Sequence, residues 1–229
     1  MHNSIPVITI DGPSASGKGT VAELVATQLG FHYLDSGALY RIVALAAKQQ
    51  NIHWDDAIAL AECAKALAIQ FKDGQVFLNG DDISDAIRTE EMGKGASRVA
   101  VHAPLRNTLL NLQHSFCKAP GLVADGRDMG TVIFPNARLK VFLTASTKVR
   151  AQRRYQQLVN KNQSGNATQI SYEDVLLDLK ERDARDKGRA SAPLIMAKDA
   201  ILLETDHLSI TKAVDHVLQN YQHFTNLSA

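Results

Sequence analysis

A short stretch near the N-terminus, DGPSASGKGT (11–20), contains residues whose types and spacing suit phosphate binding. Gly12 is followed, after four residues, by Gly17-Lys18, which is the spacing of a Walker A loop. Glycines let the backbone wrap around an anion so that successive N–H groups face phosphate oxygens, and the Lys18 ammonium would reach the outer phosphates. Gly19 stands where the simplest pattern has Ser or Thr, so Thr20 becomes the candidate Mg²⁺ ligand. An ordinary Gly-Ser turn is the alternative. The residues predicted to bind nucleotide phosphates are Gly12, Pro13, Ser14, Ala15, Ser16, Gly17, Lys18, Gly19 and Thr20.

A second stretch, KERDARDKGR (180–189), concentrates cations that suit the same anions. From 147 to 189 the chain has ten Lys and Arg residues against six Asp and Glu, whereas the whole chain has 25 against 24. A guanidinium group binds two phosphate oxygens at once and stays charged, so the cluster is predicted to form half of an electrostatic clamp. On a helix, one face would present Arg182, Arg185, Asp186 and Arg189. A solvated, ion-paired surface is the alternative, and it is the preferred interpretation for Arg185, Asp183 and Lys187.

Five apolar runs alternate with helical periodicity and predict an α/β fold, a doubly wound parallel sheet flanked by helices. They are VITI (7–10), FHYL (31–34), LVADG (122–126), LKVFLTA (139–145) and AILLETD (200–206). The phosphate loop follows the first run and opens a helix, where parallel sheets bind anions. Asp125 lies near the end of the third run as a Walker B acid would, so it is a candidate Mg²⁺ ligand through water. A purely structural hydrogen bond is the alternative role for Asp125.

The alternation of strands and helices is interrupted between 68 and 86. There the sequence predicts a β-hairpin with turns at Asp73-Gly74 and Asn79-Gly80. A hairpin at this point indicates a small inserted subdomain.

The next stretch, over about 89–117, is prone to form helix. Interruptions are expected near Gly93-Lys94-Gly95 and at Pro104. Further along, the polar segment 162–169 is predicted as a flexible connection, before a helix that begins at Ser171.

The bulk composition excludes several functional classes. With 229 residues, of which 45% are hydrophobic and 21% charged, the chain can form one large globular domain. Its net charge of +1 provides no general attraction to nucleic acid or to a membrane. Cys63 and Cys117 show no metal-site or disulfide spacing, and the N-terminal residues lack the pattern of a signal peptide. We therefore expect a cytoplasmic protein without a nucleic-acid or membrane partner, with a monomer as the default state.

Other classes of phosphate-loop protein fit the sequence less well. VNKNQ (159–163) approximates the N-K-x-D motif of guanine-binding GTPases, but Gln163 replaces the Asp. The glycine-rich LSGGQ-type signature of transporter ATPases is absent from the sequence. A small kinase remains, whose acceptor must be recognised by other parts of the chain.

Four motifs taken together resemble those of bacterial cytidylate kinases. They are DGPSASGKGT (11–20), LDSGALYR (34–41), ADGRDMGTVIFP (124–135) and KERDARDKGRASAP (180–193). The resemblance is collinear from about residue 5 to residue 218 and includes the hairpin. It implies transfer of the ATP γ-phosphoryl group to CMP or dCMP with Mg²⁺. It also implies a P-loop kinase fold with a central five-stranded parallel sheet, an NMP-binding region that contains the insert, and a mobile basic lid.

The resemblance also implies boundaries and residue roles. A single P-loop kinase unit over 1–229 would have its core at about 1–35, 118–150 and 190–229, its NMP-binding region at about 36–117, and its lid at about 150–189. The implied catalytic residues are Lys18, Arg127, Arg182 and Arg189. The implied substrate-binding residues are Ser36, Arg41, Ser97, Arg106, Arg127, Asp128, Arg182, Asp186 and Arg189. Of these, Arg41, Arg127 and Arg189 match phosphate contacts, Ser97, Arg106 and Asp128 the cytosine edge, and Arg182 and Asp186 the ribose side.

Two alternatives stay open at this point. One is a P-loop kinase for another small acceptor, such as UMP or a metabolite that is not a nucleotide. The other is a nucleotide-sensing or RNA-binding module that uses its basic segment on a polyanion. Aromatic rings for base stacking are sparse in that segment, where Tyr155 and Tyr172 are the only ones near the arginines.

Overall fold

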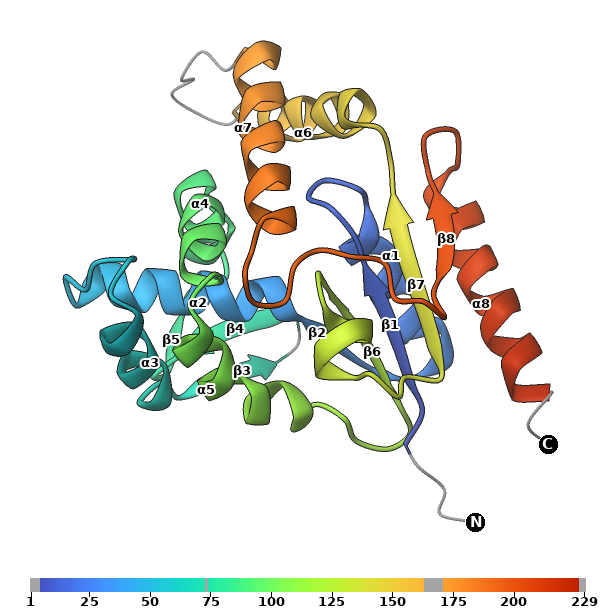
Figure 1. Cartoon of the computed structure of the whole chain (residues 1–229), viewed down its shortest axis with the longest axis horizontal. Coiled ribbons are helices and arrows are strands. Elements are labelled where there is room, and N and C mark those ends of the chain that lie inside the picture. Colours follow the sequence, from blue (N-terminus) through green and yellow to red (C-terminus); the bar gives the residue numbers. More distant parts are fainter. Residues whose placement is uncertain (1–4, 73, 163–170, 227–229) are drawn as a thin grey trace. The chain divides into compact units, whose positions relative to one another are not determined.

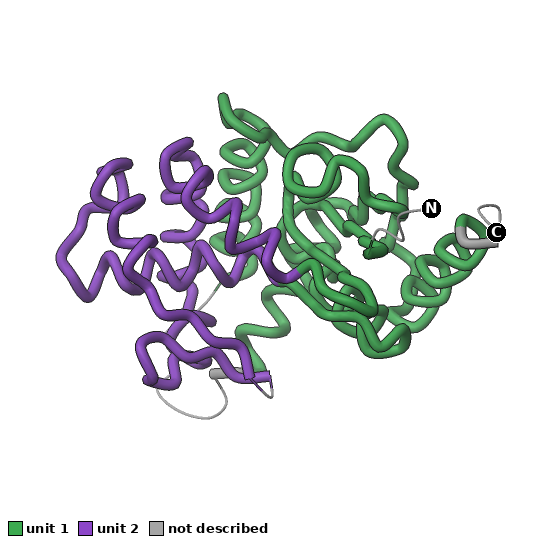
Figure 2. The backbone as a smooth tube through the Cα atoms, turned by 90° about the horizontal axis from the view of Figure 1, so that it is seen from below, with its two compact units in different colours: residues 1–34, 117–229 green, residues 35–116 purple. Residues whose placement is uncertain are grey.

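A computed structural model describes residues 5–72, 74–162 and 171–226. The chain divides into two compact units, which Figure 2 shows in different colours. Unit 1 comprises residues 1–34 and 117–229, and unit 2 comprises residues 35–116. No described helix is long and apolar enough to cross a membrane.

Unit 1 is built around a five-stranded sheet with the strand order β2-β6-β1-β7-β8 (Figure 1). Its strands are β1 (Val7–Asp11), β2 (His32–Asp35), β6 (Leu122–Gly126), β7 (Leu139–Thr144) and β8 (Ile201–Glu204). Its helices are α1 (Lys18–Leu29), the short π-helical turn η2 (Met129–Ile133), α6 (Thr147–Asn162), α7 (Tyr172–Lys187) and α8 (Ile210–Asn226). Strand β1 pairs in parallel with β6 and β7, and β7 pairs in parallel with β8. The predicted parallel α/β sheet is therefore confirmed, strand by strand.

The two faces of this sheet are covered differently, because side chains alternate along each strand. Ile8 and Ile10 of β1 are fully buried in a hydrophobic core to which α1 and α8 contribute. Thr9 and Asp11 point to the opposite face, where η2 packs. The polar side chains of β1 therefore contact the segment that follows β6.

Helices α6 and α7 pack side by side at the end of the sheet where β1 and β7 terminate (Figure 1). They share a small apolar core around Ala151, Val175 and Leu179. Helix α7 begins at the N-cap residue Ser171, whose side chain accepts from the backbone N–H of Asp174 at 3.0 Å. The predicted flexible segment lies largely outside the described residues.

Among its described residues, unit 2 contains four α-helices, one short 3₁₀ turn and a small antiparallel sheet. The helical elements are α2 (Ser36–Gln49), α3 (Ala57–Lys65), η1 (Ala86–Arg88), α4 (Glu90–Val99) and α5 (Ala103–His114). The sheet has the order β3-β4-β5, with β3 (Ile69–Lys72), β4 (Gln75–Leu78) and β5 (Asp81–Asp82). The predicted hairpin is thus extended by a third strand. Its second turn has the positive φ angles of 53° at Asn79 and 96° at Gly80 that a tight hairpin turn requires.

One predicted helix break is wrong and the other is correct. Gly93-Lys94-Gly95 does not interrupt α4, which runs unbroken from Glu90 to Val99. A Cβ atom on Gly95 would lie 2.7 Å from the Trp54 ring, so this glycine permits close packing on the helix. Pro104 does mark a break, because it occupies the first turn of α5, where its missing N–H costs nothing.

Candidate active site

The loop between β1 and α1 has a backbone conformation suited to an anion. A Cβ atom on Gly12 would lie 2.0 Å from the backbone oxygen of Leu143, so only glycine permits the close approach of this loop to β7. Ala15 and Gly17 have φ angles of 59° and 92°, in the left-handed region where the backbone turns tightly. Gly17 is also the N-cap of α1, so the partial positive charge of that helix end opens onto the loop.

The Lys18 ammonium lies close to the carboxylate of Asp125, at the end of the neighbouring strand β6. Lys18 Nζ is 4.0 Å from Asp125 Oδ2, and the Tyr33 hydroxyl donates to Asp125 Oδ1 at 2.9 Å. A Cβ atom on Gly19 would come within 3.8 Å of the same carboxylate, which therefore faces the first turn of α1. Thr20 lies in that turn and is exposed. No group of three or more His, Cys, Asp or Glu residues with metal-binding geometry occurs in the described ranges.

Asp11, the last residue of β1, is a buried carboxylate that holds the segment after β6. Its Oδ1 and Oδ2 accept from the backbone N–H groups of Met129 and Gly130, both at 2.8 Å. Burial raises the pKa of Asp11 to about 6, and the nearby Asp128 raises it as well, while the two N–H groups and Lys18 act in the opposite direction. No role was predicted for Asp11 from the sequence. An acidic residue at the end of a buried apolar strand is the sequence signal of such a role.

Arg127 connects the phosphate loop to Asp186 in the last turn of α7, which also contacts Arg189 beyond the end of that helix. Its Nη2 donates to Ser14 Oγ at 2.7 Å, and its Nε donates to Asp186 Oδ2 at 2.6 Å. Asp186 also accepts from Arg189, and only 1% of the Asp186 side chain is exposed. Burial by itself would raise the pKa of Asp186, but the charges of Arg127, Arg189 and Arg182 and the Arg127 hydrogen bond hold that pKa below its usual value. Ser14 and Asp186, which lie far apart in the sequence, thus both contact the guanidinium group of Arg127.

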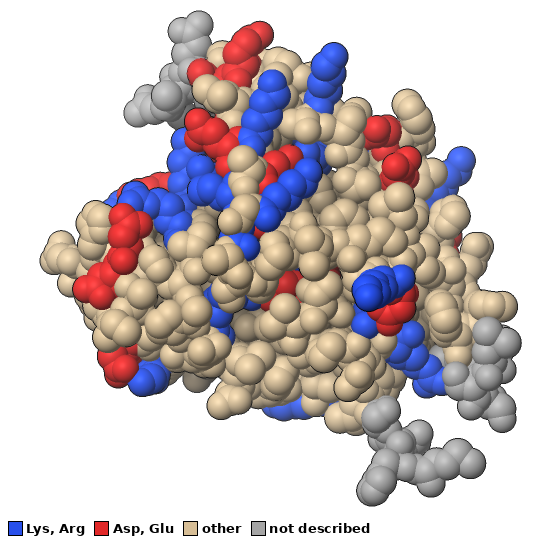
Figure 3. All heavy atoms as spheres, viewed as in Figure 1, with Lys and Arg blue, Asp and Glu red and all other residues tan. Residues whose placement is uncertain are grey.

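Lys and Arg side chains gather with Asp and Glu over α6 and α7, in the upper part of Figure 3. Arg185 forms an exposed pair with Glu181 at 3.7 Å, and Lys187 is exposed, so the solvated interpretation of these two residues is confirmed. For Asp183 that interpretation is wrong. Its carboxylate pairs with the buried guanidinium of Arg150 on α6, with distances of 3.0 and 2.5 Å.

Unit 2 contains four of the residues matched to acceptor binding. Ser36 is buried at the start of α2, directly after the N-cap residue Asp35, whose side chain accepts from the N–H of Ala38 at 3.0 Å. The capping role considered for this segment is therefore confirmed, with the Asp35 side chain as the cap acceptor. Arg41 Nη1 donates to the backbone oxygens of Ile87 and Thr89, at 2.9 and 3.2 Å.

The other two residues lie on α4 and α5. Ser97 is buried on α4, and Arg106 is buried on α5. Arg106 Nη1 donates to the backbone oxygen of Ala100 at 3.3 Å, and its guanidinium carbon lies 5.8 Å from the centre of the Tyr40 ring. Buried polar side chains of this kind can recognise the polar edge of a base when their remaining donors face it. Asp128 of unit 1 is likewise buried.

A family model described as "Cytidylate kinase" matches residues 8–223 of the chain. The chain belongs to the cytidylate kinase family. A cytidylate kinase of Paraburkholderia phymatum is 58% identical over 217 residues, covering 95% of this chain and 93% of that protein. A cytidylate kinase of Chromobacterium violaceum is 55% identical over 219 residues, covering 96% of both chains.

Among solved structures, one of an uncharacterized protein from Eubacterium ventriosum has a TM-score of 0.51. It is 10% identical and covers 95% of this chain and 98% of that chain, so the likeness concerns the fold alone. The family match and the identity to curated cytidylate kinases confirm the resemblance of the four motifs, and membership of this kinase family implies the use of ATP.

Two arginines of α6 contact the phosphate loop, a role that was not predicted for them from the sequence. Arg150 Nη1 donates to the backbone oxygen of Ser14 at 3.1 Å, and Arg153 Nη1 donates to the backbone oxygen of Ser16 at 3.3 Å. Both arginines were counted only as part of the net charge of the segment. Their separation of three residues on one helix was a usable signal, but nothing in the sequence indicated that their partners are main-chain oxygens of the phosphate loop.

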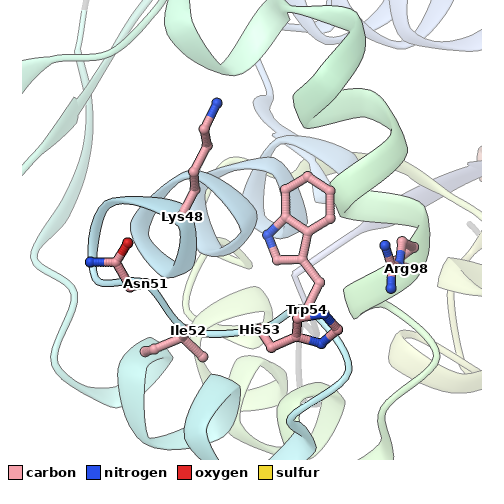
Figure 4. A pocket seen from close by; sticks show the side chains of 6 residues that line it. All are labelled: Lys48, Asn51, Ile52, His53, Trp54 and Arg98. Carbon is pink, nitrogen blue, oxygen red and sulfur yellow. The ribbon is translucent and has the colours of Figure 1, made fainter.

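A cavity of about 310 Å³ lies in unit 2, apart from the predicted site residues (Figure 4). Its lining residues are Lys48, Asn51, Ile52, His53, Trp54 and Arg98. Lys48 pairs with Glu91 and Arg98 pairs with Asp55, both at 2.6 Å, so the cations at this cavity already have counter-charges. This arrangement does not favour a second anion site.

Proposed function

We propose that the protein transfers the γ-phosphoryl group of ATP to CMP or dCMP, giving ADP and CDP or dCDP, with Mg²⁺. The observation that carries this proposal, beside membership of the family, is the position of Arg127. Its guanidinium bonds both Ser14 of the phosphate loop and Asp186 of the α7 cluster. A cation in that position can neutralise negative charge on the transferred phosphoryl group. Positioning the reactants and neutralising this charge are the main contributions of a protein to phosphoryl transfer.

The phosphate loop is the proposed ATP site. Its N–H groups and the N-terminus of α1 would bind the phosphate chain, and Lys18 would reach the β- and γ-phosphates. Ser16 supports this assignment, because its hydroxyl is buried and has no hydrogen-bond partner among the described residues. A buried hydroxyl left in that state costs roughly 1–3 kcal/mol, and a phosphate oxygen would supply the missing partner.

Mg²⁺ would be bound beside Lys18. The Asp125 carboxylate fits this ion, because Mg²⁺ prefers a few oxygen ligands, keeps several waters and bridges to nucleotide phosphates. The exposed Thr20 hydroxyl is the second candidate. When bound, the ion would offset negative charge on the phosphates, while Tyr33 keeps the Asp125 carboxylate oriented.

Acceptor recognition is proposed to involve both units. In unit 2, Arg41 would bind the acceptor phosphate, and Ser97 with Arg106 would bind the cytosine edge. In unit 1, the Asp128 carboxylate would accept from the cytosine amino group, as carboxylates do in base readout. Ser36 is the remaining acceptor contact in unit 2, and Arg182, Asp186 and Arg189 are the remaining contacts in unit 1.

We propose the functional division of the chain that the family resemblance implies. The core would comprise about 1–35, 118–150 and 190–229, the NMP-binding region about 36–117, and the lid about 150–189. Lys18, Arg127, Arg182 and Arg189 would together neutralise the charge that builds up between the two nucleotides. The proposed working form is a cytoplasmic monomer, in keeping with the free thiols of Cys63 and Cys117.

A coupled assay of ATP consumption tests the substrate assignment. CMP, dCMP, UMP and AMP are offered in turn at equal concentration, with and without Mg²⁺. Faster turnover with CMP and dCMP than with UMP or AMP is expected. Turnover that is indifferent to CMP, but supported by another acceptor, would replace cytidylate by that acceptor. RNA binding that weakens steeply with salt, without turnover, would support the binding-module alternative.

A further inference from the structure

The outward-facing backbone oxygens of the phosphate loop are held by two guanidinium groups of α6. Arg150 bonds the oxygen of Ser14, and Arg153 bonds the oxygen of Ser16. The Thr205 hydroxyl also donates to Ser16 O at 3.3 Å. The loop is therefore supported from behind, on the side opposite to the one that its N–H groups face.

Each of these oxygens belongs to a peptide unit that has an N–H on the next residue. The oxygen of Ser14 shares its peptide plane with the N–H of Ala15, and the oxygen of Ser16 shares its plane with the N–H of Gly17. In a trans peptide the C=O and N–H bonds point in opposite directions. A cation that fixes the oxygen on one side therefore aims the N–H at the other side. It also polarises the peptide, which makes that N–H a stronger donor.

Arg150 has no N–H left over for a nucleotide. The guanidinium group has five N–H donors. Besides Ser14 O, they reach Ala145 O at 2.9 Å, Thr147 Oγ1 at 3.0 Å, and the two oxygens of Asp183 at 3.0 and 2.5 Å. Only 4% of the Arg150 side chain is exposed. An arginine in this state acts on substrate through the loop that it holds.

Ala15 shows why such support matters. Its φ of 59° lies in the left-handed region, which costs a residue with a Cβ atom roughly 1–2 kcal/mol. A strained conformation persists only where surrounding contacts impose it. The Arg150 hydrogen bond acts on the peptide that immediately precedes the Ala15 Cα atom, so it is placed to maintain this conformation.

We propose that Arg150 is a positioning residue for phosphoryl transfer, which holds and polarises the peptide that presents the Ala15 N–H to the triphosphate. This inference rests on the proposed function, because it takes the loop to be the ATP site. Asp183 on α7 is the counter-charge of Arg150, so the position of the Arg150 guanidinium depends on α7 as well as on α6. Arg150 should affect the binding of a nucleoside triphosphate or diphosphate at the loop. It should not affect the binding of the acceptor nucleotide.

Kinetics of two variants test this role. Arg150→Lys keeps the charge without the planar fork, and Arg150→Met removes the charge while keeping much of the length. We expect kcat to fall about 10- to 100-fold in Arg150→Met, as happens when a support or a donor of a reacting group is lost. The KM for ATP is expected to rise, while the KM for CMP stays near the wild-type value. Arg138→Met, at an exposed arginine of unit 1, is the matched control and should retain wild-type kinetics.

Amide proton chemical shifts in the ligand-free protein provide a second test. A variant that is merely less stable, but still folded, should not change the shift of one loop amide selectively. In Arg150→Lys the Ala15 amide proton should shift upfield, because its peptide is less polarised. The Gly17 amide, which Arg153 supports, should shift less and serves as the internal control. In Arg153→Lys the pattern should reverse.

Three results would overturn the inference. They are unchanged kcat and ATP KM in both Arg150 variants, equal shifts of the two amides, or a rise in the KM for CMP alone. If Arg150→Met does not fold, Arg150→Lys and Asp183→Asn still test the inference. Asp183→Asn as a single substitution should lower kcat, whereas the double variant with Arg150→Lys should have a kcat close to that of Arg150→Lys. Wild-type protein that does not phosphorylate CMP would refute the proposed function instead, and the amide shifts would still report whether Arg150 polarises the loop.

Discussion

Replacement of Asp11 by asparagine should change how the stability of the protein depends on pH. The pKa of Asp11 is about 6 in the folded protein, against 3.8 for an ordinary aspartate. Because the folded pKa is raised, the folded state binds the proton more tightly than the unfolded state does. The contribution to stability is therefore fully present below about pH 3.8 and is lost as the pH rises through about 6.

The difference between the two pKa values sets the expected magnitude. It corresponds to about 3 kcal/mol of differential interaction between the charged and the neutral carboxyl. Between about pH 7.5 and about pH 5 the folded Asp11 becomes mostly protonated. Over that interval the free energy of unfolding of the wild type should rise by about 1.4 kcal/mol relative to Asp11→Asn. Asparagine cannot accept from both Met129 and Gly130, so the variant also carries a loss of roughly 1–3 kcal/mol that does not depend on pH.

Urea denaturation followed by circular dichroism, at several pH values in this interval, measures the effect. All other titrating groups, Asp128 and Lys18 included, are common to both proteins and cancel to a first approximation in the difference. Asp56→Asn is the matched control, because Asp56 also accepts from a backbone N–H, at 3.0 Å, but is an exposed N-cap that asparagine replaces well. A difference between wild type and Asp11→Asn that stays constant with pH would refute the reasoning that burial perturbs Asp11.

Three further predictions concern the site. Lys18→Met should lower kcat by at least about 100-fold while the circular dichroism spectrum stays that of the folded protein, and near-normal turnover would exclude Lys18 from phosphate binding. Asp186→Asn should change the ratio of turnover with CMP to turnover with dCMP if this carboxylate meets the ribose; an unchanged ratio would leave it only the role of holding Arg127 and Arg189. Gly12→Ala should weaken ADP binding, measured by calorimetry, about 10-fold or more, because its Cβ atom would collide with Leu143 O and displace the loop. Unchanged affinity in Gly12→Ala would show that the loop accommodates the methyl group without moving.

Local patterns predicted most of the fold. The strands of the main sheet were found because a strand buried on both faces is rich in apolar residues, and β1 and β6 are buried at every position. The break at Pro104 was found because proline lacks the N–H that a helix interior needs. The break expected at Gly93-Lys94-Gly95 was wrong, since glycine only weakens a helix, and Gly95 allows the Trp54 ring to pack closely against α4.

The candidate site also contains some features that local sequence predicts and others that it does not. The phosphate loop and the presence of an arginine cluster could be predicted from contiguous residues, because Walker A spacing and charge density are local properties. The partner of each arginine depends on how the chain folds. Asp183 proved to be the counter-charge of a buried Arg150, and Asp11 proved to hold the amides after β6, because hydrogen bonds act over about 3 Å in space and the chain brings distant residues to that distance only by folding.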